Sequence, residues 1–100
     1  MKYRLEFIQA AYLDIQEAWL WYEEQKVGLG EEFLLSLEAS FNQIQRNPLL
    51  YQIAFSKVRV ALLRRFPYRI VYTLADSTIG VVGVLHTSRD PSIWNERIRN

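Results

Sequence analysis

Arginine side chains and a single histidine in the second half of the chain are the residues best suited to chemistry. The candidates are Arg59, Arg65, Arg69 and His86. Arginine presents a rigid fork of donors that matches phosphate or carboxylate oxygens, and histidine exchanges a proton near neutral pH. Together these residues could cleave RNA: the arginines would hold the scissile phosphate, and a base or acid would move the proton of the ribose 2′-hydroxyl.

The spacing of the arginines predicts where their side chains point. Alternation places Arg59 and Arg65 on one side of a strand, and Arg69 on the face of the next strand that does not carry Tyr68. If these strands pair antiparallel, the three guanidinium groups can converge on one patch. The structural alternative is that strand arginines extend along a sheet surface or pair with acidic residues.

His86 has two interpretations of the same kind. It closes a strand just before Arg89, Asp90 and Trp94, where an imidazole could either transfer a proton or fix the turn by hydrogen bonding. Other chemistries lack their residues, because the chain has no cysteine, one histidine, no G-x-S-x-G sequence and no phosphate-binding loop. We therefore predict no metal, no cofactor and no small-molecule substrate.

Length and composition predict one domain over residues 1–100. Half of the residues are hydrophobic and 14% are aromatic, which suffices for a core. Apolar runs fall short of the roughly 18 residues that span a bilayer, and the alternating start MKYRLEFIQ does not have the pattern of a signal peptide. We expect a cytoplasmic protein, in keeping with the absence of cysteine.

Charge is distributed unevenly between the two halves of the chain. Residues 1–50 carry four basic and eight acidic groups, whereas residues 51–100 carry eight basic and three acidic groups. Such asymmetry favours an anionic partner for the basic half, either nucleic acid or an acidic protein segment. The alternative is that the two halves neutralise each other across a shared core.

The first half is predicted to form a strand followed by a helical hairpin. Residues 1–8 alternate between polar and apolar, as a half-buried strand does. Segments 10–26 and 31–46 carry apolar residues at helical spacing, and the glycines between them can form a turn. The polar residues of the first helix are expected to be solvated: Asp14, Glu17, Glu23 and Glu24.

The first of these helices has more apolar residues than one buried stripe needs. Ala11, Ile15 and Ala18 belong to the stripe, but Leu13 and Trp21 fall outside it. This excess indicates that the helix is covered on a second side or contacts a partner.

The second half is predicted to be mainly strands. Residues 49–56 are expected to form a connector, residues 93–100 a short helix or tail, and three segments between them strands, namely 57–66, 68–75 and 78–87. Gly80 and Gly83 within the last strand indicate a bulge or a close approach. The order β-α-α-β-β-β predicts an α+β domain, with the hairpin on one face of a mostly antiparallel sheet and the other face open or partly covered.

In this order and spacing, several short motifs resemble the RelE/ParE superfamily of toxins from type II toxin–antitoxin modules. The resemblance covers nearly the whole chain. Its pieces are A-x-x-D-I-x-x-A-x-x-x-Y (11–22), G-L-G-x-x-F (28–33), N-P (47–48), F-P-Y-R-I-V-Y (66–72) and H-x-x-R-D-P-x-x-W (86–94). The resemblance implies a toxin that a cognate antitoxin neutralises by wrapping it. RelE-like members cut mRNA on the ribosome, and ParE-like members inhibit DNA gyrase.

The resemblance also implies roles for single residues. Arg69 matches an arginine of the RelE-like active site, and Lys57, Arg59 and Arg65 could supply the basic residues of the preceding strands. Trp94 stands near the position of the RelE-like C-terminal tyrosine, and tryptophan can stack on a base but cannot donate a proton as tyrosine does.

We therefore favour a ParE-like, plasmid-stabilising toxin that binds gyrase. The target- or antitoxin-binding candidates are Lys57, Arg64, Arg89 and Trp94. The first alternative is a RelE-like, metal-independent mRNA endoribonuclease that uses Arg69, Arg59, Arg65 and His86. The second alternative is a degenerate member without toxicity.

Overall fold

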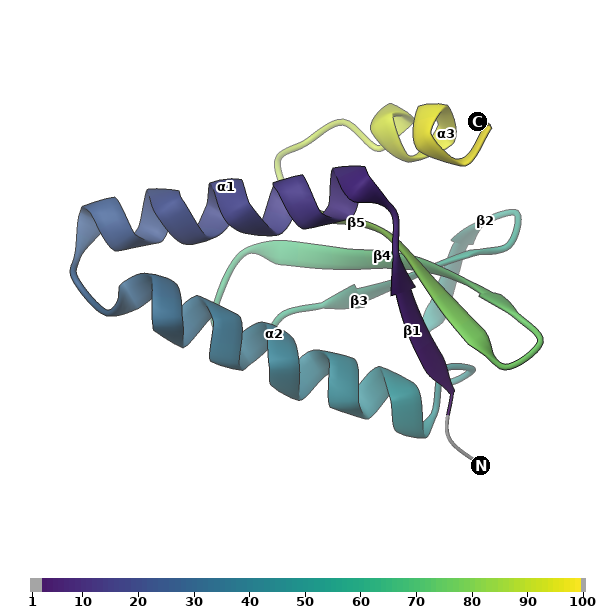
Figure 1. Cartoon of the computed structure of the whole chain (residues 1–100). Coiled ribbons are helices and arrows are strands. Elements are labelled where there is room, and N and C mark those ends of the chain that lie inside the picture. The colour runs from purple at the N-terminus through teal and green to yellow at the C-terminus, as the bar shows by residue number, and fades with distance from the viewer. Residues whose placement is uncertain (1–2, 100) are drawn as a thin grey trace.

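A computed structural model describes residues 3–99 of the chain. Residues 1–2 of the predicted first strand and residue 100 of the predicted last helix lie outside the described residues. The elements are β1 (Arg4–Phe7), α1 (Gln9–Gln25), α2 (Leu29–Arg46), β2 (Gln52–Phe55), β3 (Val58–Leu62), β4 (Tyr68–Ala75), β5 (Thr78–His86) and α3 (Ser92–Arg99) (Figure 1). The α+β class and the helical hairpin are confirmed.

The strands form one five-stranded sheet in the order β1-β5-β4-β3-β2. β1 runs parallel to β5, and the other pairs are antiparallel, so the sheet is mostly antiparallel as predicted. The prediction for residues 49–56 was wrong, because they contain the edge strand β2. The predicted strand 57–66 is also too long. β3 ends at Leu62, and the Leu63 N–H then bonds to the Tyr68 carbonyl across a tight loop.

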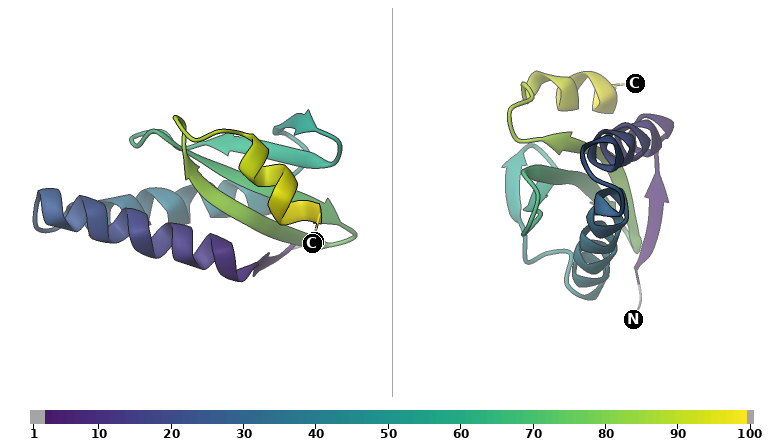
Figure 2. Two further views of the ribbon diagram at one scale, coloured as in Figure 1. Left: turned by 90° about the horizontal axis from the view of Figure 1, so that it is seen from above. Right: turned by 90° about the vertical axis from the view of Figure 1, so that its left-hand side faces the viewer.

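Two apolar clusters lie on opposite faces of this sheet. The α1–α2 hairpin packs on the face that carries Ala61, Ile70 and Tyr72. On the other face, Val71 and Leu85 pack with Trp94 of α3, among other residues. Figure 2 shows α3 lying over the sheet, apart from α2. The second face is therefore partly covered, and the uncovered part lies toward β2.

The turn between α1 and α2 is closed by a carboxylate from α1. Glu23 accepts hydrogen bonds from the backbone N–H groups of Gly28, at 3.0 and 3.2 Å, and of Gly30, at 3.0 Å. It caps the N-terminus of α2, where the helix dipole favours negative charge. Gly28 has a φ of 93°, which glycine adopts readily. Glu23 was expected to be solvated; it is half-buried instead, because its position in the last turn of α1 brings it to the start of α2.

A buried ion pair joins α1, β5 and α3. Asp14 is 8% exposed, and its carboxylate accepts two hydrogen bonds from Arg97, at 2.6 and 3.0 Å, and one from the Val84 N–H, at 3.0 Å. Arg97 also donates to the Val82 carbonyl at 3.0 Å. The prediction that Asp14 is solvated was wrong, because it follows Ala11 by three residues and precedes Ala18 by four, and so shares their buried stripe.

The sequence of β5 explains how this ion pair reaches the backbone. The register against β4 shifts at Val82, which is the bulge that the strand glycines predicted. β1 covers β5 only as far as Val81, so the edge beyond it is open to Asp14 and Arg97. A Cβ at Gly83 would lie 2.7 Å from Arg97 Nη1 and 3.2 Å from Asp14 Oδ2, so a larger residue would have to displace the ion pair. Glycine here permits the close approach.

Candidate functional site

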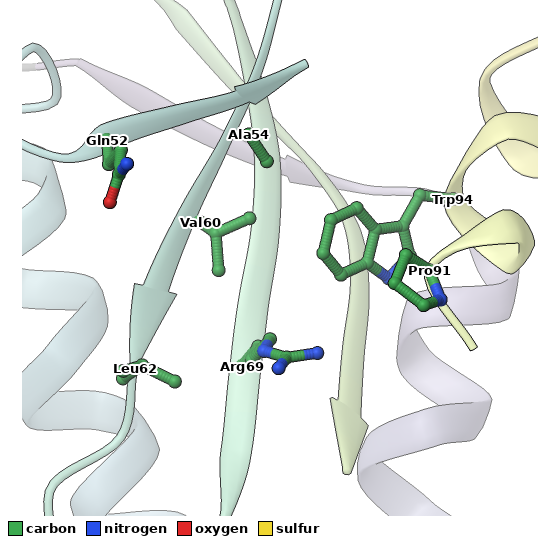
Figure 3. A pocket seen from close by; sticks show the side chains of 7 residues that line it. All are labelled: Gln52, Ala54, Val60, Leu62, Arg69, Pro91 and Trp94. Atoms are coloured by element: carbon green, nitrogen blue, oxygen red, sulfur yellow. The ribbon is translucent and has the colours of Figure 1, made fainter. Parts of the chain in front are cut away.

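An open trough of about 370 Å³ lies on the sheet face opposite the hairpin. Its walls come from three strands and from the start of α3 (Figure 3), and its lining residues are Gln52, Ala54, Val60, Leu62, Arg69, Pro91 and Trp94. Most of this lining is apolar. Arg69 is the one charged side chain in it.

Arg69 lies in β4 between Leu62 of β3 and Leu85 of β5. Its half-buried guanidinium extends toward Trp94, with Cζ 5.9 Å from the ring centroid, within range of a cation–π contact (Figure 3). Within residues 3–99 Arg69 makes no hydrogen bond or ion pair. Its donors are therefore available to an incoming oxygen anion.

Trp94 is only 5% exposed and forms one wall of the trough. Its ring stacks on Phe55, with centroids 6.3 Å apart and planes 9° from parallel. The indole Nε1 has no hydrogen-bond partner within the described residues. The predicted binding role of Trp94 thus concerns a side chain that is mostly packed against the sheet rather than displayed on the surface.

The structure does not bring Arg59 and Arg65 to Arg69, so the expected convergence was wrong. Arg59 pairs in register with Tyr72, on the hairpin face, and donates to the Tyr51 carbonyl at 2.6 Å. Arg65 lies in the loop after β3 and forms a 2.7 Å ion pair with Glu32. The alternation argument failed because the strand ends at Leu62, so Arg65 no longer follows its period.

His86 also lies away from the trough. It pairs in register with Tyr68, one position before Arg69, and alternation therefore places it on the hairpin face. Its Nδ1 accepts a hydrogen bond from the Ser88 N–H at 3.0 Å and contacts Ser88 Oγ at 2.8 Å. With Arg89 and Glu17 it lines a separate cavity of about 190 Å³. These bonds match the interpretation of His86 as a residue that fixes the turn.

The remaining basic candidates are exposed and dispersed. Lys57 sits in the turn between β2 and β3, and Arg64 in the loop between β3 and β4. Arg64 lines a further cavity of about 530 Å³ beside α2, together with Glu32. Neither residue lines the trough.

The trough is equipped to bind an anion rather than to transfer protons. An unpaired guanidinium among apolar side chains attracts a carboxylate or phosphate more strongly than a fully exposed one, because the apolar walls lower the local dielectric. The lining contains no carboxylate, histidine or tyrosine that could act as a general acid or base beside Arg69. Gln52 and Ala54 were missed from the sequence because β2 was read as a connector; the alternation of residues 52–55 is too short to reveal a strand.

Within residues 3–99, no three His, Asp or Glu side chains come close enough together to hold a metal ion. None of the described helices is both long and apolar enough to cross a membrane.

Solved structures with the same arrangement are toxins and toxin–antitoxin complexes. The chromosomal ParDE system of P. aeruginosa aligns with a TM-score of 0.74 at 12% identity, over 84% of this chain and 95% of that one. The intact E. coli RelBE complex aligns with a TM-score of 0.67 at 20% identity, over 87% and 99%. RelBE2 of Mycobacterium tuberculosis aligns with a TM-score of 0.62 at 22% identity, over 86% and 99%. At these identities the likeness shows a shared fold.

The fold is thus that of the RelE/ParE toxin structures. Residues 5–91 match the family model of the ParE toxin of type II toxin–antitoxin system, parDE. The chain belongs to this family. A comparison with curated proteins found no significant match.

Proposed function

We propose that this toxin acts by binding DNA gyrase and is neutralised by a cognate antitoxin. The match of residues 5–91 to the ParE family supports this target. The observation that carries the proposal is the Arg69 trough, in which one free guanidinium stands among apolar side chains without an acid or base. Such a surface suits protein binding, since apolar contact and one strong polar anchor supply affinity and orientation.

The positions of the other candidates argue against cleavage of RNA. Arg59 is held by backbone carbonyls, Arg65 by Glu32, and His86 by Ser88 on the opposite face of the sheet. Trp94 is buried where a RelE-like tyrosine is expected. A nuclease needs a proton-transfer group near the group that holds the phosphate. One observation favours the RelE-like alternative, namely that Arg69 alone could hold a phosphate.

The antitoxin in this proposal covers the same trough. An antitoxin segment with a carboxylate flanked by apolar side chains would pair with Arg69 and fill the space against Val60 and Leu62. Toxin activity and antitoxin binding would then compete for one guanidinium. Structural relatives that are themselves complexes with antitoxins support such a partner.

Induced expression in E. coli without an antitoxin tests the target. The expected result is growth arrest with a DNA-damage response, loss of plasmid supercoiling and intact mRNA. Arg69→Ala should relieve the arrest while leaving the fold intact, because the side chain makes no hydrogen bond within residues 3–99. Arg46→Ala removes an exposed arginine in the last turn of α2, outside the trough, and should leave toxicity unchanged.

Two other outcomes point to the alternatives. Rapid cleavage of translated messages, abolished by Arg69→Ala, would replace gyrase by the ribosome as target and make the chain an endoribonuclease. Unimpaired growth with folded protein present in the cells would indicate a degenerate member.

A further inference from the structure

We infer that the α1–α2 hairpin carries a docking groove for a cationic amphipathic helix. This groove, called here the hairpin groove, has a volume of about 520 Å³ and is lined by Ile15, Gln16, Trp19, Leu20 and Leu34. It lies between the helices, whereas the Arg69 trough lies across the sheet. The inference is independent of whether gyrase is the target.

The hairpin groove exposes more apolar surface than a fully covered helix pair would. Leu20 is 52% exposed, and Tyr12, on the same side of α1, is 55% exposed. Ile15 and Leu34 pack against the core at the bottom of the groove, so its floor is continuous with a rigid interior. Contiguous exposed apolar surface of this kind marks an interaction site more often than isolated surface leucines do.

The charges around the hairpin groove are of one sign. α1 carries four acidic residues and no lysine or arginine, and α2 carries three acidic residues and only Arg46, in its last turn. Glu31 and Glu38 stand three residues before and four residues after Leu34, and so share its side of α2. Neither has an ion pair within residues 3–99. A partner that fills the groove therefore meets unpaired carboxylates and must supply lysine or arginine.

The shape of the surface selects a helix over an extended strand. The backbone groups of α1 and α2 are bonded within their own helices, so the groove offers no free edge to an extended peptide. A helix satisfies its own backbone and can place apolar side chains at i, i+3, i+4 and i+7 along the groove. The partner is thus an amphipathic helix with an apolar stripe flanked by basic residues.

Binding of two designed peptides tests this inference. Both are amphipathic helices of about 18 residues with the same leucine stripe, long enough to be helical when bound, and they differ in carrying lysine or glutamate beside it. Isothermal titration against the full chain should show the lysine peptide binding at least about ten-fold more tightly at low salt, with the difference shrinking as salt screens the charges.

Two charge-reversed variants locate the site. Glu31→Lys/Glu38→Lys should invert the preference in favour of the glutamate peptide. The matched control Glu6→Lys/Asp76→Lys makes the same change in net charge on β1 and in the turn between β4 and β5, outside the groove lining, and should keep the original preference. Leu20→Ser, at an exposed position, should weaken both peptides by about ten-fold, the cost of losing one well-packed anchor.

Three results would overturn the inference. Equal affinity for the two peptides would remove the charge argument. Equal effects of the two double variants would leave only long-range attraction and no groove. Self-association of the chain, detected by sedimentation and abolished by Leu20→Ser, would make a second copy the occupant.

Discussion

Trp94 combines a packed ring with a buried indole N–H that meets no acceptor within residues 3–99. A buried donor without a partner costs roughly 1–3 kcal/mol, whereas the ring itself stabilises the second face by stacking on Phe55 and lying beneath Arg69. The ring of Trp94 therefore stabilises the fold while its unpaired N–H destabilises it, and substitutions can separate the two effects.

We expect Trp94→Phe to be tolerated and Trp94→Ala to be costly. Phenylalanine keeps aromatic packing and removes the unsatisfied N–H, so the free energy of unfolding should fall by less than about 1.5 kcal/mol. Alanine leaves a cavity and should cost about 3–5 kcal/mol. Urea denaturation monitored by circular dichroism measures both. Equal losses in the two variants would show that the indole N–H has a partner after all.

The buried hydroxyl of Tyr72 makes the free energy of unfolding depend on pH in the alkaline range. Burial raises the pKa of Tyr72 from 10.0 to about 12, against a smaller lowering by Arg59. The folded protein therefore keeps the phenol proton at pH values where the unfolded chain has lost it. The resulting stabilisation is complete below the unfolded pKa of 10.0 and is lost as the pH rises toward about 12.

Tyr72→Phe should reduce the loss of stability that accompanies a rise in pH above 10.0. The substitution also removes the 2.6 Å hydrogen bond from the Tyr72 hydroxyl to the Pro48 carbonyl, so stability near neutral pH should fall by about 1–3 kcal/mol. Chemical denaturation at a series of pH values checks both effects. The slope should be reduced but not abolished, because burial also raises the pKa values of Tyr22 and Tyr68. A Tyr12→Phe control, at an exposed position, should behave like the wild type.

At the scale of the elements, the N-terminus of α2 depends on a cap that comes from α1 and not from the sequence of α2 itself. α2 has no side-chain cap at Gly28, and Glu23 of α1 supplies the acceptor instead. Gly30 lets the helices come together, because a Cβ there would lie 2.9 Å from the Trp19 carbonyl oxygen. The two helices therefore stabilise each other at the turn.

Glu23→Ala should lower stability by about 0.5–2 kcal/mol, the usual cost of losing a helix cap. Thermal unfolding measures the change, and Glu24→Ala provides the neighbouring exposed carboxylate as control. If both variants lost the same stability, Glu23 would contribute only as one more negative charge on α1, and its hydrogen bonds to the start of α2 would add nothing.

Across the whole molecule, the Asp14–Arg97 pair connects the hairpin layer to α3 around the free edge of β5. The side-chain hydrogen bond to Asp14 raises the pKa of Arg97 above its ordinary value, against the opposing effect of burial. Arg97 therefore stays charged at any ordinary pH. Removing its partner leaves an uncompensated guanidinium and an orphaned Val84 N–H.

Asp14→Ala should cost about 3–5 kcal/mol, as breaking a buried pair usually does. Hydrogen exchange should show the largest loss of protection in α3 and the end of β5, because this pair joins both of them to α1. Arg97→Ala in the same background should then cost little more, which a double-mutant cycle quantifies. Additive losses would mean that the two side chains act separately.

Much of the fold was accessible from local patterns. The periods of α1, α2, β4 and β5 were visible because each is long enough to repeat several times, and Gly83 correctly indicated a bulge or close approach in β5. β2 was missed because four residues of a mostly exposed edge strand carry almost no alternation. In the candidate site, Arg69 and Trp94 were predicted, but the trough walls from β2 were not.

The amino-acid sequence by itself determined the order of the elements other than β2, and the face of β4 that Arg69 occupies, because helical and strand periods are local properties. Tertiary structure alone decided which charges meet. Strand register and the early end of β3 sent Arg59 and Arg65 to other partners. The fold of α3 onto β5 buried Asp14 against Arg97, a residue 83 positions away. Contacts between distant segments depend on how the layers pack, and no local period encodes that.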